Sequence, residues 1–239
     1  MSDGIQRPPV LEADGVVKEF RGGDGAILRV LDEVALTVQA GEMVAIMGYS
    51  GAGKSTLLHV LGALEPPSAG RIAIGGQPLA ALSDDALAEL RNRSVGFVFQ
   101  FHHLLREFSA LENVMMPLRI AGWTDDAARV RAETLLEMVG LTPRRHHRPS
   151  ELSGGEQQRT AVARALALEP ALVLADEPSG NLDAQNAERL HDLLAALARQ
   201  QSLGMIVVTH NPSLAARADR TLVLEGGRLV ETQTHGGAA

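Results

Sequence analysis

Gly48-Tyr49-Ser50-Gly51-Ala52-Gly53-Lys54-Ser55-Thr56 matches the pattern G-x-x-x-x-G-K-[ST] of phosphate-binding loops. Residues 43–47, just before it, form a short apolar run, long enough for a buried strand and too short for a helix. Apolar side chains recur at helical spacing after it: Leu57, Leu58, Val60, Leu61 and Leu64. A strand, a glycine-rich loop and a helix in this order are the context in which the motif binds phosphate. The sequence therefore predicts a P-loop core.

The residue types in this loop suit a triphosphate. Gly48, Gly51 and Gly53 allow backbone conformations that a Cβ would penalise, so successive N–H groups can point at phosphate oxygens. The helix that follows adds the partial positive charge of its N-terminus. Lys54 is expected to reach the β- and γ-phosphates, and the Ser55 hydroxyl to ligate Mg²⁺. A Gly/Ser-rich surface turn before a lysine is the alternative, but it does not require the flanking strand and helix. We expect residues 48–56 to bind a nucleoside triphosphate.

The composition narrows the class of protein. The chain has 239 residues, of which 45% are hydrophobic and 21% charged, as in an ordinary globular domain. Its formal net charge of −7 argues against a broad nucleic-acid-binding surface, which needs clustered Lys and Arg. Cysteine is absent, which excludes thiolate chemistry. Because no apolar run reaches the length of about 18 residues that a membrane span needs, membrane contact is expected only through partner proteins.

Strand patterns dominate the N-terminal part of the chain. Residues 10–20 and 34–38 are expected to be strands joined by a glycine-rich turn at 22–25, and residues 71–74 alternate like another strand. Ser83 is placed to cap a short helix. These patterns predict a small antiparallel β-subdomain at the N-terminus.

Residues 101–168 carry helical patterns and no strand signal. One helical face is formed by Leu111, Val114, Met115 and Leu118, and Pro117 is expected to interrupt that helix. A second helix is expected over residues 127–139, with four side chains inward: Val130, Thr134, Leu135 and Met138. We expect this region to be a helical subdomain inserted into an α/β core.

The core pattern resumes after Pro170. A strand at 172–175, a helix at 184–199, a strand at 205–209 and a hairpin around Gly226-Gly227 are expected. Alternating strands and helices imply a largely parallel sheet. The predicted fold is a single α/β P-loop NTPase domain over residues 10–232, with flexible tails at 1–9 and 233–239.

The apolar run at residues 171–175 predicts a strand, and two carboxylates follow at its end. In a parallel sheet, ligands bind beyond the carboxyl ends of the strands, where Asp176 would support Mg²⁺ and Glu177 would orient and activate a water. The alternative is a strand that simply leaves for solvent. The presence of a P-loop in the same chain favours the functional interpretation.

The stretch Leu152-Ser153-Gly154-Gly155-Glu156 admits two interpretations. Ser153 followed three residues later by Glu156 is a capping box, which would make this only a helix start. A capping box does not account for Gly154 and Gly155, which weaken a helix start unless the backbone must approach something closely. A helix N-terminus without side chains is also an anion site.

The order of these motifs resembles a known family. The P-loop, Gln100, the Leu152–Glu156 stretch, Asp176-Glu177, Gly180-Asn181-Leu182-Asp183 and His210 follow one another as in the ATP-binding subunits of ABC transporters. The resemblance covers roughly residues 10–232. It implies ATP as the nucleotide, with Mg²⁺, and hydrolysis as the reaction.

The resemblance implies roles at the nucleotide. Phe20 is similar to the aromatic residue that stacks on adenine, and Gln100 to the switch residue that touches Mg²⁺ and senses the partner. Ser153 and Gly155, with Gly154 between them, are similar to the signature residues that cap the γ-phosphate of ATP held by another subunit.

The remaining matching positions concern catalysis and communication. Glu177 resembles the catalytic base, and His210 the residue that holds the γ-phosphate and the attacking water. Asp183 resembles the residue of a loop through which the two subunits communicate. Ala52 departs from the usual loop by lacking a hydroxyl, and little effect is expected because the loop binds mainly through backbone N–H groups.

Stretches between the motifs resemble one branch of the family. Residues 100–105, 111–118 and 147–152 look like the ATPase of lipoprotein-releasing exporters, to which macrolide-type exporter and cell-division ABC ATPases are related. The pairs His102-His103 and His146-His147 do not predict a metal site, because adjacent residues do not converge and no carboxylate or cysteine cluster accompanies them.

The resemblance also implies an assembly. Two copies are expected to pair head to tail around two ATP molecules, attached to two transmembrane permease subunits at the cytoplasmic face of the inner membrane. A soluble ABC-type ATPase acting on ribosomes or DNA is the alternative; such proteins usually carry two such domains or a long coiled-coil insertion. A binding module without catalysis would need a damaged motif, and none is damaged.

Overall fold

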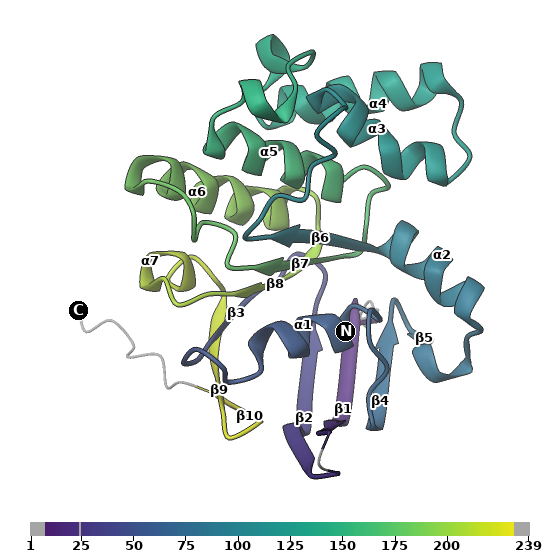
Figure 1. Cartoon of the computed structure of the whole chain (residues 1–239), viewed down its shortest axis with the longest axis vertical. Helices are drawn as coiled ribbons and strands as arrows, with labels where there is room; N and C mark the ends of the chain where they lie inside the picture. The colour runs from purple at the N-terminus through teal and green to yellow at the C-terminus, as the bar shows by residue number, and fades with distance from the viewer. Residues whose placement is uncertain (1–7, 24, 232–239) are drawn as a thin grey trace, which may run out of the picture.

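The computed structural model describes residues 8–23 and 25–231, which form two β-sheets and the helices around them (Figure 1). The expected tail at 233–239, most of the tail at 1–9, and Asp24 of the expected 22–25 turn lie outside the described residues. No helix of the described part is long and apolar enough to cross a bilayer.

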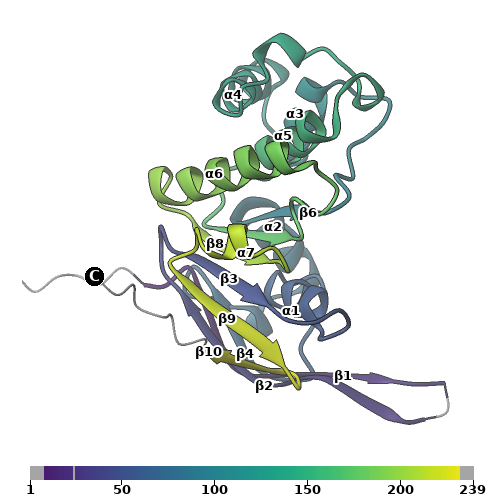
Figure 2. The ribbon, with the colours of Figure 1, turned by 90° about the vertical axis from the view of Figure 1, so that its left-hand side faces the viewer.

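The smaller sheet is antiparallel, as expected. Its order is β2-β1-β4-β5, with β1 (Leu11–Arg21) paired to β2 (Ile27–Val38) and β4 (Ala69–Ile74), and with β5 (Gln77–Pro78) at the edge. The second strand begins at Ile27, well before the predicted Val34. Its first residues are exposed, so the apolar alternation that reveals a strand is present only in its second half. The hairpin of β1 and β2 projects from the body (Figure 2).

The larger sheet runs in the order β10-β9-β3-β8-β7-β6. Its strands are β3 (Met43–Met47), β6 (Val95–Phe99), β7 (Leu172–Asp176), β8 (Gly204–Val208), β9 (Arg220–Glu225) and β10 (Arg228–Glu231). All neighbours are parallel except β9 and β10, which form the expected final hairpin. The carboxyl ends of the parallel strands therefore meet at one edge, where a ligand site is built.

Both faces of this sheet are covered. Along β7, Leu172 and Leu174 belong to one hydrophobic cluster, whereas Val173 and Ala175 belong to the other, as the period of two in a strand requires. The first cluster packs against α1 (Lys54–Leu61) and the antiparallel sheet; the second packs against the helical region and α6 (Ala184–Gln200). Figure 1 shows these layers, with α3 to α6 above the sheet and α1 below it.

The remaining helices are short. They are α2 (Asp84–Ser94), α3 (Ala110–Ile120), α4 (Asp125–Met138), α5 (Gly154–Ala165), α7 (Pro212–Ala215) and the 3-10 turns η1 (Leu79–Ala81), η2 (Thr142–Arg144) and η3 (Pro149–Glu151). Ser83 caps α2, as predicted, by accepting a hydrogen bond from the Ala86 N–H. Between β6 and β7, over the predicted insertion 101–168, the described residues form helices and turns only.

Two predictions about the helical region are wrong. Pro117 does not interrupt α3, which continues to Ile120 because Leu118, just beyond the proline, is fully buried and packing outweighs the lost backbone hydrogen bond. The second helix turns a different face inward. Val130 is 64% exposed and Met138 38% exposed, and Thr134 is exposed as well.

Small residues occupy the inward face of α4. Ala128 and Ala132 are fully buried, together with Leu135, Leu136 and Val139. The inward face of α4 thus combines alanines with leucines, and Val130 and Met138 lie on the exposed side of the helix. Of the side chains predicted inward on this helix, only Leu135 is buried.

Candidate functional site

The P-loop joins the carboxyl end of β3 to the first turn of α1, as predicted. Gly53 precedes α1 with φ +94°, a left-handed conformation that favours glycine. A Cβ there would lie 2.7 Å from Cγ1 of Val30 on β2, so packing also requires glycine. Because Gly53 offers no side-chain cap, the first N–H groups of α1 face the loop and are available to an anion.

A pocket of about 660 Å³ lies over this loop. Its lining residues are Val30, Gly48, Ser50, Gly51, Gly53, Lys54, Ser55, Thr56, Gln100, Asp176, Glu177 and His210. Segments far apart in the sequence therefore meet here, and every lining residue except Val30 is a predicted site residue. A larger pocket, of about 890 Å³, lies against the antiparallel sheet and includes none of the predicted site residues.

Two residues of the predicted loop do not line the pocket with their side chains. Tyr49 is 64% exposed and Ala52 is buried. The Tyr49 carbonyl nevertheless shapes the site, because the Lys54 ammonium donates to it at 3.0 Å and to the Gly48 carbonyl at 2.9 Å. The loop thus holds its own cation at the pocket through backbone oxygens.

Glu177 and His210 form a close pair at the carboxyl edge of the sheet. His210 Nδ1 lies 2.8 Å from Glu177 Oε1, and the Thr209 hydroxyl and the His210 N–H each donate to Glu177 Oε2 at 3.3 Å. The Glu177 side chain is 17% exposed, whereas that of His210 is 74% exposed. A carboxylate fixed in this way beside a phosphate loop has the geometry of a general base with an orienting partner.

The backbone at Glu177 is unusual. Its φ is +44°, in the left-handed region that costs a non-glycine residue of order 1–3 kcal/mol. Its N–H donates to the Val208 carbonyl at 2.9 Å, and its carbonyl accepts from the Gly180 N–H at 3.0 Å. These bonds maintain a conformation that aims the carboxylate at the pocket rather than along the strand.

Gln100 is held against the loop that follows Glu177. Its amide Nε2 donates to Asn181 Oδ1 at 3.2 Å, and Asn181 Nδ2 donates to the Gln100 carbonyl at 3.1 Å. A Cβ at Gly180 would lie 2.9 Å from Gln100 Nε2, so a larger residue there would require the Gln100 side chain to shift. Asn181, Thr209 and Val30 were not predicted as site residues, because each acts through a contact with another segment.

Three predicted metal ligands come together in the pocket. Asp176 on β7 pairs with Phe99 on β6, so Gln100, the residue after Phe99, lies next to Asp176. Ser55, directly after the P-loop lysine, lines the same pocket. A hydroxyl, a carboxylate and an amide oxygen form a hard-oxygen donor set that suits Mg²⁺. Among the described residues, no group of three or more His, Cys, Asp or Glu side chains is placed to hold a metal ion.

Ser153 forms the capping box. The Ser153 hydroxyl accepts from the Glu156 N–H at 3.3 Å, and the Ser153 N–H donates to Glu156 Oε2 at 2.8 Å. This backbone hydrogen bond, aided by Arg144, holds the pKa of Glu156 below its usual value. The capping interpretation is confirmed, and the turn does not line the P-loop pocket of its own chain.

The two glycines of this turn differ. A Cβ at Gly155 would lie 2.9 Å from Asn186 Oδ1 at the start of α6, so packing within the chain explains this glycine. Gly154 meets only Leu182 Cδ2, at an ordinary 3.7 Å, and is exposed. Asp183 caps α6 by accepting from the Asn186 N–H at 3.0 Å, and hydrogen bonds from Asn186 lower the pKa of Asp183.

Phe20 and the paired histidines lie outside the pocket lining. Phe20, near the end of β1, is 39% exposed, and Lys18 Nζ lies 5.0 Å from its ring centre. The carbonyls of His102 and His103 accept from the Arg164 guanidinium at 2.8 and 2.7 Å. Burial lowers the pKa of His102.

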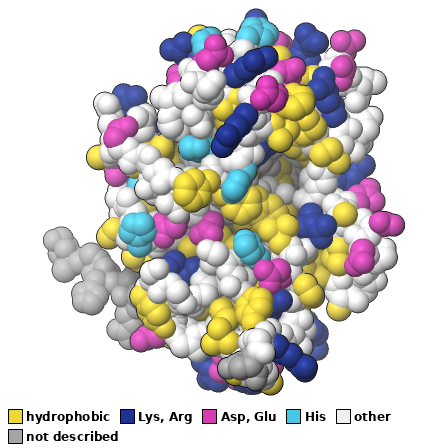
Figure 3. Space-filling view, in the orientation of Figure 1, with side chains coloured by type: hydrophobic (Ala, Val, Ile, Leu, Met, Phe, Trp, Pro, Cys, Tyr) yellow, Lys and Arg dark blue, Asp and Glu magenta, His cyan; other side chains and the backbone are white. Residues whose placement is uncertain are grey.

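On the face seen in Figure 3, positively and negatively charged side chains are intermixed, without the large basic area that nucleic-acid binding uses.

Comparisons with known proteins agree with these motifs. A family model described as ABC transporter matches residues 31–180. The chain is 53% identical to the lipoprotein-releasing system ATP-binding protein LolD of Bordetella pertussis (strain Tohama I), over 96% of this chain and 99% of that protein. It is 52% identical to the protein of the same name from Chromohalobacter salexigens, over 93% of each.

Among solved structures, the fold is similar to an ATP-binding cassette in a dimeric post-hydrolysis state bound to ADP and Pi. The TM-score is 0.86 and the identity 37%, covering 95% of this chain and all of that one.

Proposed function

This chain belongs to the ABC transporter family as an ATP-binding and ATP-hydrolysing subunit, and from that premise we propose that it powers the release of lipoproteins from the inner membrane through membrane-embedded partners. Support for the cargo comes from relatives that are more than half identical over nearly their whole length and are named as ATP-binding proteins of a lipoprotein-releasing system. The observation that carries the proposed site is the meeting of the P-loop, Gln100, Asp176, Glu177 and His210 around one pocket.

The pocket's own residues suggest how hydrolysis proceeds. The N–H groups of the P-loop and the Lys54 ammonium bind the β- and γ-phosphates. The purine would extend beyond this lining to stack on Phe20, near the end of β1. Glu177 accepts a proton from the attacking water, while His210, held 2.8 Å away, contacts the γ-phosphate and keeps Glu177 oriented. Ser55, Asp176 and Gln100 would hold Mg²⁺, which when bound neutralises charge that develops on the phosphates.

A second copy of the chain completes each site. Ser153 and Gly154 are exposed at a helix start that does not line the chain's own pocket, and within the chain nothing sterically requires glycine at 154. A head-to-tail dimer would bring this turn to the γ-phosphate bound by the other copy, where the α5 N-terminus favours negative charge. The related cassette of known structure is dimeric. Asp183, at the start of α6 beside this turn, would sense the partner.

The partners would be two transmembrane permease subunits, with the ATPase dimer bound peripherally at the cytoplasmic face of the inner membrane. No helix among residues 8–23 and 25–231 can span a bilayer, so the chain would reach the membrane through these partners. The cargo would then be handled by the permeases, and ATP-driven closure of the dimer would supply the work.

The test is purification of the tagged chain from detergent-solubilised membranes, followed by reconstitution into vesicles that contain a lipoprotein. We expect two membrane proteins to accompany the chain and ATP to release the lipoprotein, whereas Glu177→Gln should bind ATP without release. Transport of a macrolide instead would assign the chain to a related exporter. Isolation with ribosomes or DNA and without membrane proteins would contradict the proposal.

A further inference from the structure

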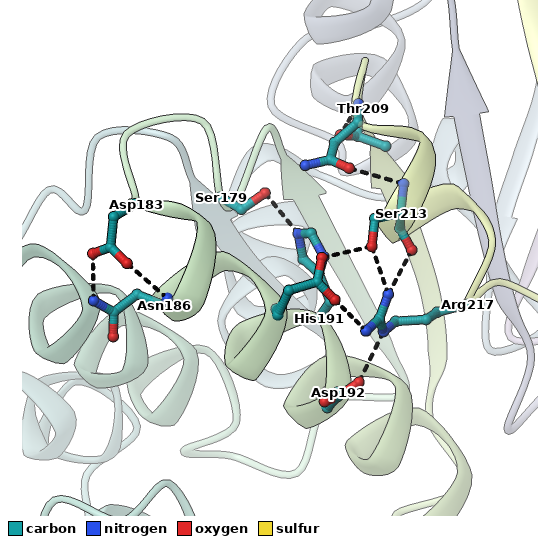
Figure 4. A network of polar contacts seen from close by, with 10 residues as sticks. Ser179, Asp183, Asn186, His191, Asp192, Thr209, Ser213 and Arg217 are labelled. Carbon is teal, nitrogen blue, oxygen red and sulfur yellow. Dashed lines mark hydrogen bonds and ion pairs between the residues drawn. The ribbon is translucent and has the colours of Figure 1, made fainter.

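One turn of α6 contacts both of the segments that carry Glu177 and His210, which are called the catalytic pair below. Glu188, His191 and Asp192 have the i, i+3 and i+4 spacing that places side chains on one helix face. Figure 4 shows this face directed at two neighbours: Ser179, in the loop after β7, and Arg217, just after α7. Neither His191 nor Arg217 lines the nucleotide pocket.

His191 holds the loop that follows Glu177. Its Nε2 lies 2.8 Å from the Ser179 hydroxyl; His191 is fully buried and Ser179 is 7% exposed. The other ring nitrogen, Nδ1, has no hydrogen-bond partner and lies 3.7 Å from Glu188 Oε1. The direction of the hydrogen bond with Ser179 depends on which ring nitrogen carries the proton. The Glu188 carboxylate near Nδ1 favours the tautomer in which Nε2 accepts from the Ser179 hydroxyl. Burial lowers the pKa of His191, consistent with a neutral ring.

This contact bears on the base because the loop is closed on itself. The Gly180 N–H donates to the Glu177 carbonyl at 3.0 Å, and the Leu182 N–H donates to the Ser179 carbonyl at 3.1 Å. Glu177 has the left-handed φ of +44°, which persists only where its surroundings hold it. The Ser179 hydroxyl ties this turn to α6.

Arg217 holds the segment that contains His210. Its guanidinium donates to Glu188 Oε2 at 2.6 Å and to Asp192 Oδ1 at 2.9 Å, and also to the Ser213 carbonyl at 2.8 Å. The Ser213 hydroxyl donates to Glu188 Oε1 at 2.6 Å. Hydrogen bonds from Ser213 and Arg217 hold the pKa of Glu188 below its usual value. The network is therefore ionic and multiply bonded rather than a single surface ion pair.

The hydrogen bonds continue from α7 to the base. Asn211 caps α7 by accepting from the Ser213 N–H at 2.9 Å, and the Asn211 N–H donates to the Thr209 hydroxyl at 3.0 Å. That hydroxyl donates to Glu177. Both members of the catalytic pair are thus anchored on the same turn of α6, by different routes.

We propose that this turn of α6 sets the position of Glu177 relative to His210, with His191 and Arg217 as positioning residues for ATP hydrolysis. The inference rests on the roles proposed above for Glu177 and His210. β7 and β8 are paired neighbours up to Asp176 and Val208, and the two routes hold the segments beyond these strand ends, where Glu177 and His210 lie 2.8 Å apart. A misplacement of about 1 Å in such a pair costs up to about 100-fold in rate.

The experiment compares the full chain with His191→Phe, Arg217→Met and the variant that carries both. Phenylalanine keeps the ring volume without an acceptor nitrogen, and methionine keeps the length of the arginine stem. We expect the double variant to lose at least about 10-fold in kcat, with the Kd for ATP within about twofold of wild type. Arg217→Lys, which retains one cation, should lose less than Arg217→Met.

A matched control separates positioning from stability. Leu194→Ala, on the same helix and fully buried, creates a cavity that lowers Tm while leaving the network intact. It should keep the wild-type kcat at temperatures well below its Tm. If the double variant keeps kcat within about twofold of wild type, or if Leu194→Ala loses as much kcat at equal loss of Tm, the inference is overturned.

Glu177→Gln, measured alongside, tests the underlying role. If that variant is active, the proposed base is wrong whatever α6 does. If it is inactive and the double variant is active, only the positioning role fails.

Discussion

Replacing Glu177 by glutamine tests the chemistry of the site with the least disturbance to its shape. The glutamine amide oxygen can still accept from the Thr209 hydroxyl and the His210 N–H, both of which contact one carboxylate oxygen at 3.3 Å. The left-handed backbone and the Glu177 N–H bond to Val208 are unchanged by the substitution. What is lost is the ability to take a proton from water, and the glutamine NH2 group replaces the oxygen that faces His210 Nδ1 at 2.8 Å.

The size of the loss in rate is set by the proton transfer. General base catalysis contributes about 10²–10⁴-fold to a rate. Because the Glu177 side chain is only 17% exposed, bulk water has poor access to replace it, and we expect kcat to fall at least about 100-fold, or roughly 2.7 kcal/mol in activation free energy. The Lys54 ammonium is held by the Gly48 and Tyr49 carbonyls and not by Glu177, so the Kd for ATP should stay within about threefold.

The assay is steady-state phosphate release together with equilibrium binding of ATP, followed by sizing of the protein with ATP present. The expected result is a protein that binds ATP, retains it and accumulates as a closed dimer. Glu225→Gln is the matched control, since Glu225 also ends a parallel strand of the sheet but does not line the pocket. Turnover by Glu177→Gln near the wild-type rate would refute the assignment of the base.

Three further results are expected. Phe20→Ala should weaken ATP binding by roughly 5- to 150-fold, the equivalent of about 1–3 kcal/mol for a base–aromatic stack, and Phe20→Tyr should be nearly neutral; a loss of Tm without loss of affinity would show a structural role instead. Cysteines placed at Ser50 and Gly154 in this cysteine-free chain should cross-link between two chains when ATP is added; linkage only within a chain, or none, would contradict the shared site. Burial lowers the pKa of His102 and His191, so below the ordinary value of 6.5 the unfolded chain binds more protons than the folded one. Urea titrations should therefore show a free energy of unfolding that keeps this contribution above about pH 6.5 and declines as the pH falls. The decline with pH should be less steep in His191→Phe, and an unchanged decline in that variant would exclude His191 as a cause of the pH dependence.

The sequence alone determined the parts of the site that are local. The P-loop sits between an apolar run and a helical pattern, and these contiguous residues predict β3, the loop and α1 without reference to any other segment. The same holds for the two carboxylates at the carboxyl end of β7, because a strand's end follows from its own pattern. It holds also for the Ser153 capping box, which spans residues 153–156. Parallel strands also require that such ends meet at one edge.

Only the tertiary structure decided which segments meet there and how each side chain is held. The sheet order places β3 between β9 and β8, an adjacency that no local period encodes. For this reason three contacts were not predicted: the packing of Val30 against Gly53 of the P-loop, the hydrogen bond from Thr209 to Glu177, and the hydrogen bond between Gln100 and Asn181. The inward face of α4 was predicted wrongly because larger apolar side chains were favoured over Ala128 and Ala132, which are the buried ones. Gly155 is a further example, because a Cβ at this position would crowd Asn186, which lies on a helix that begins beyond β7. Packing between distant segments sets these contacts, and periodicity reports only which side of an element is apolar.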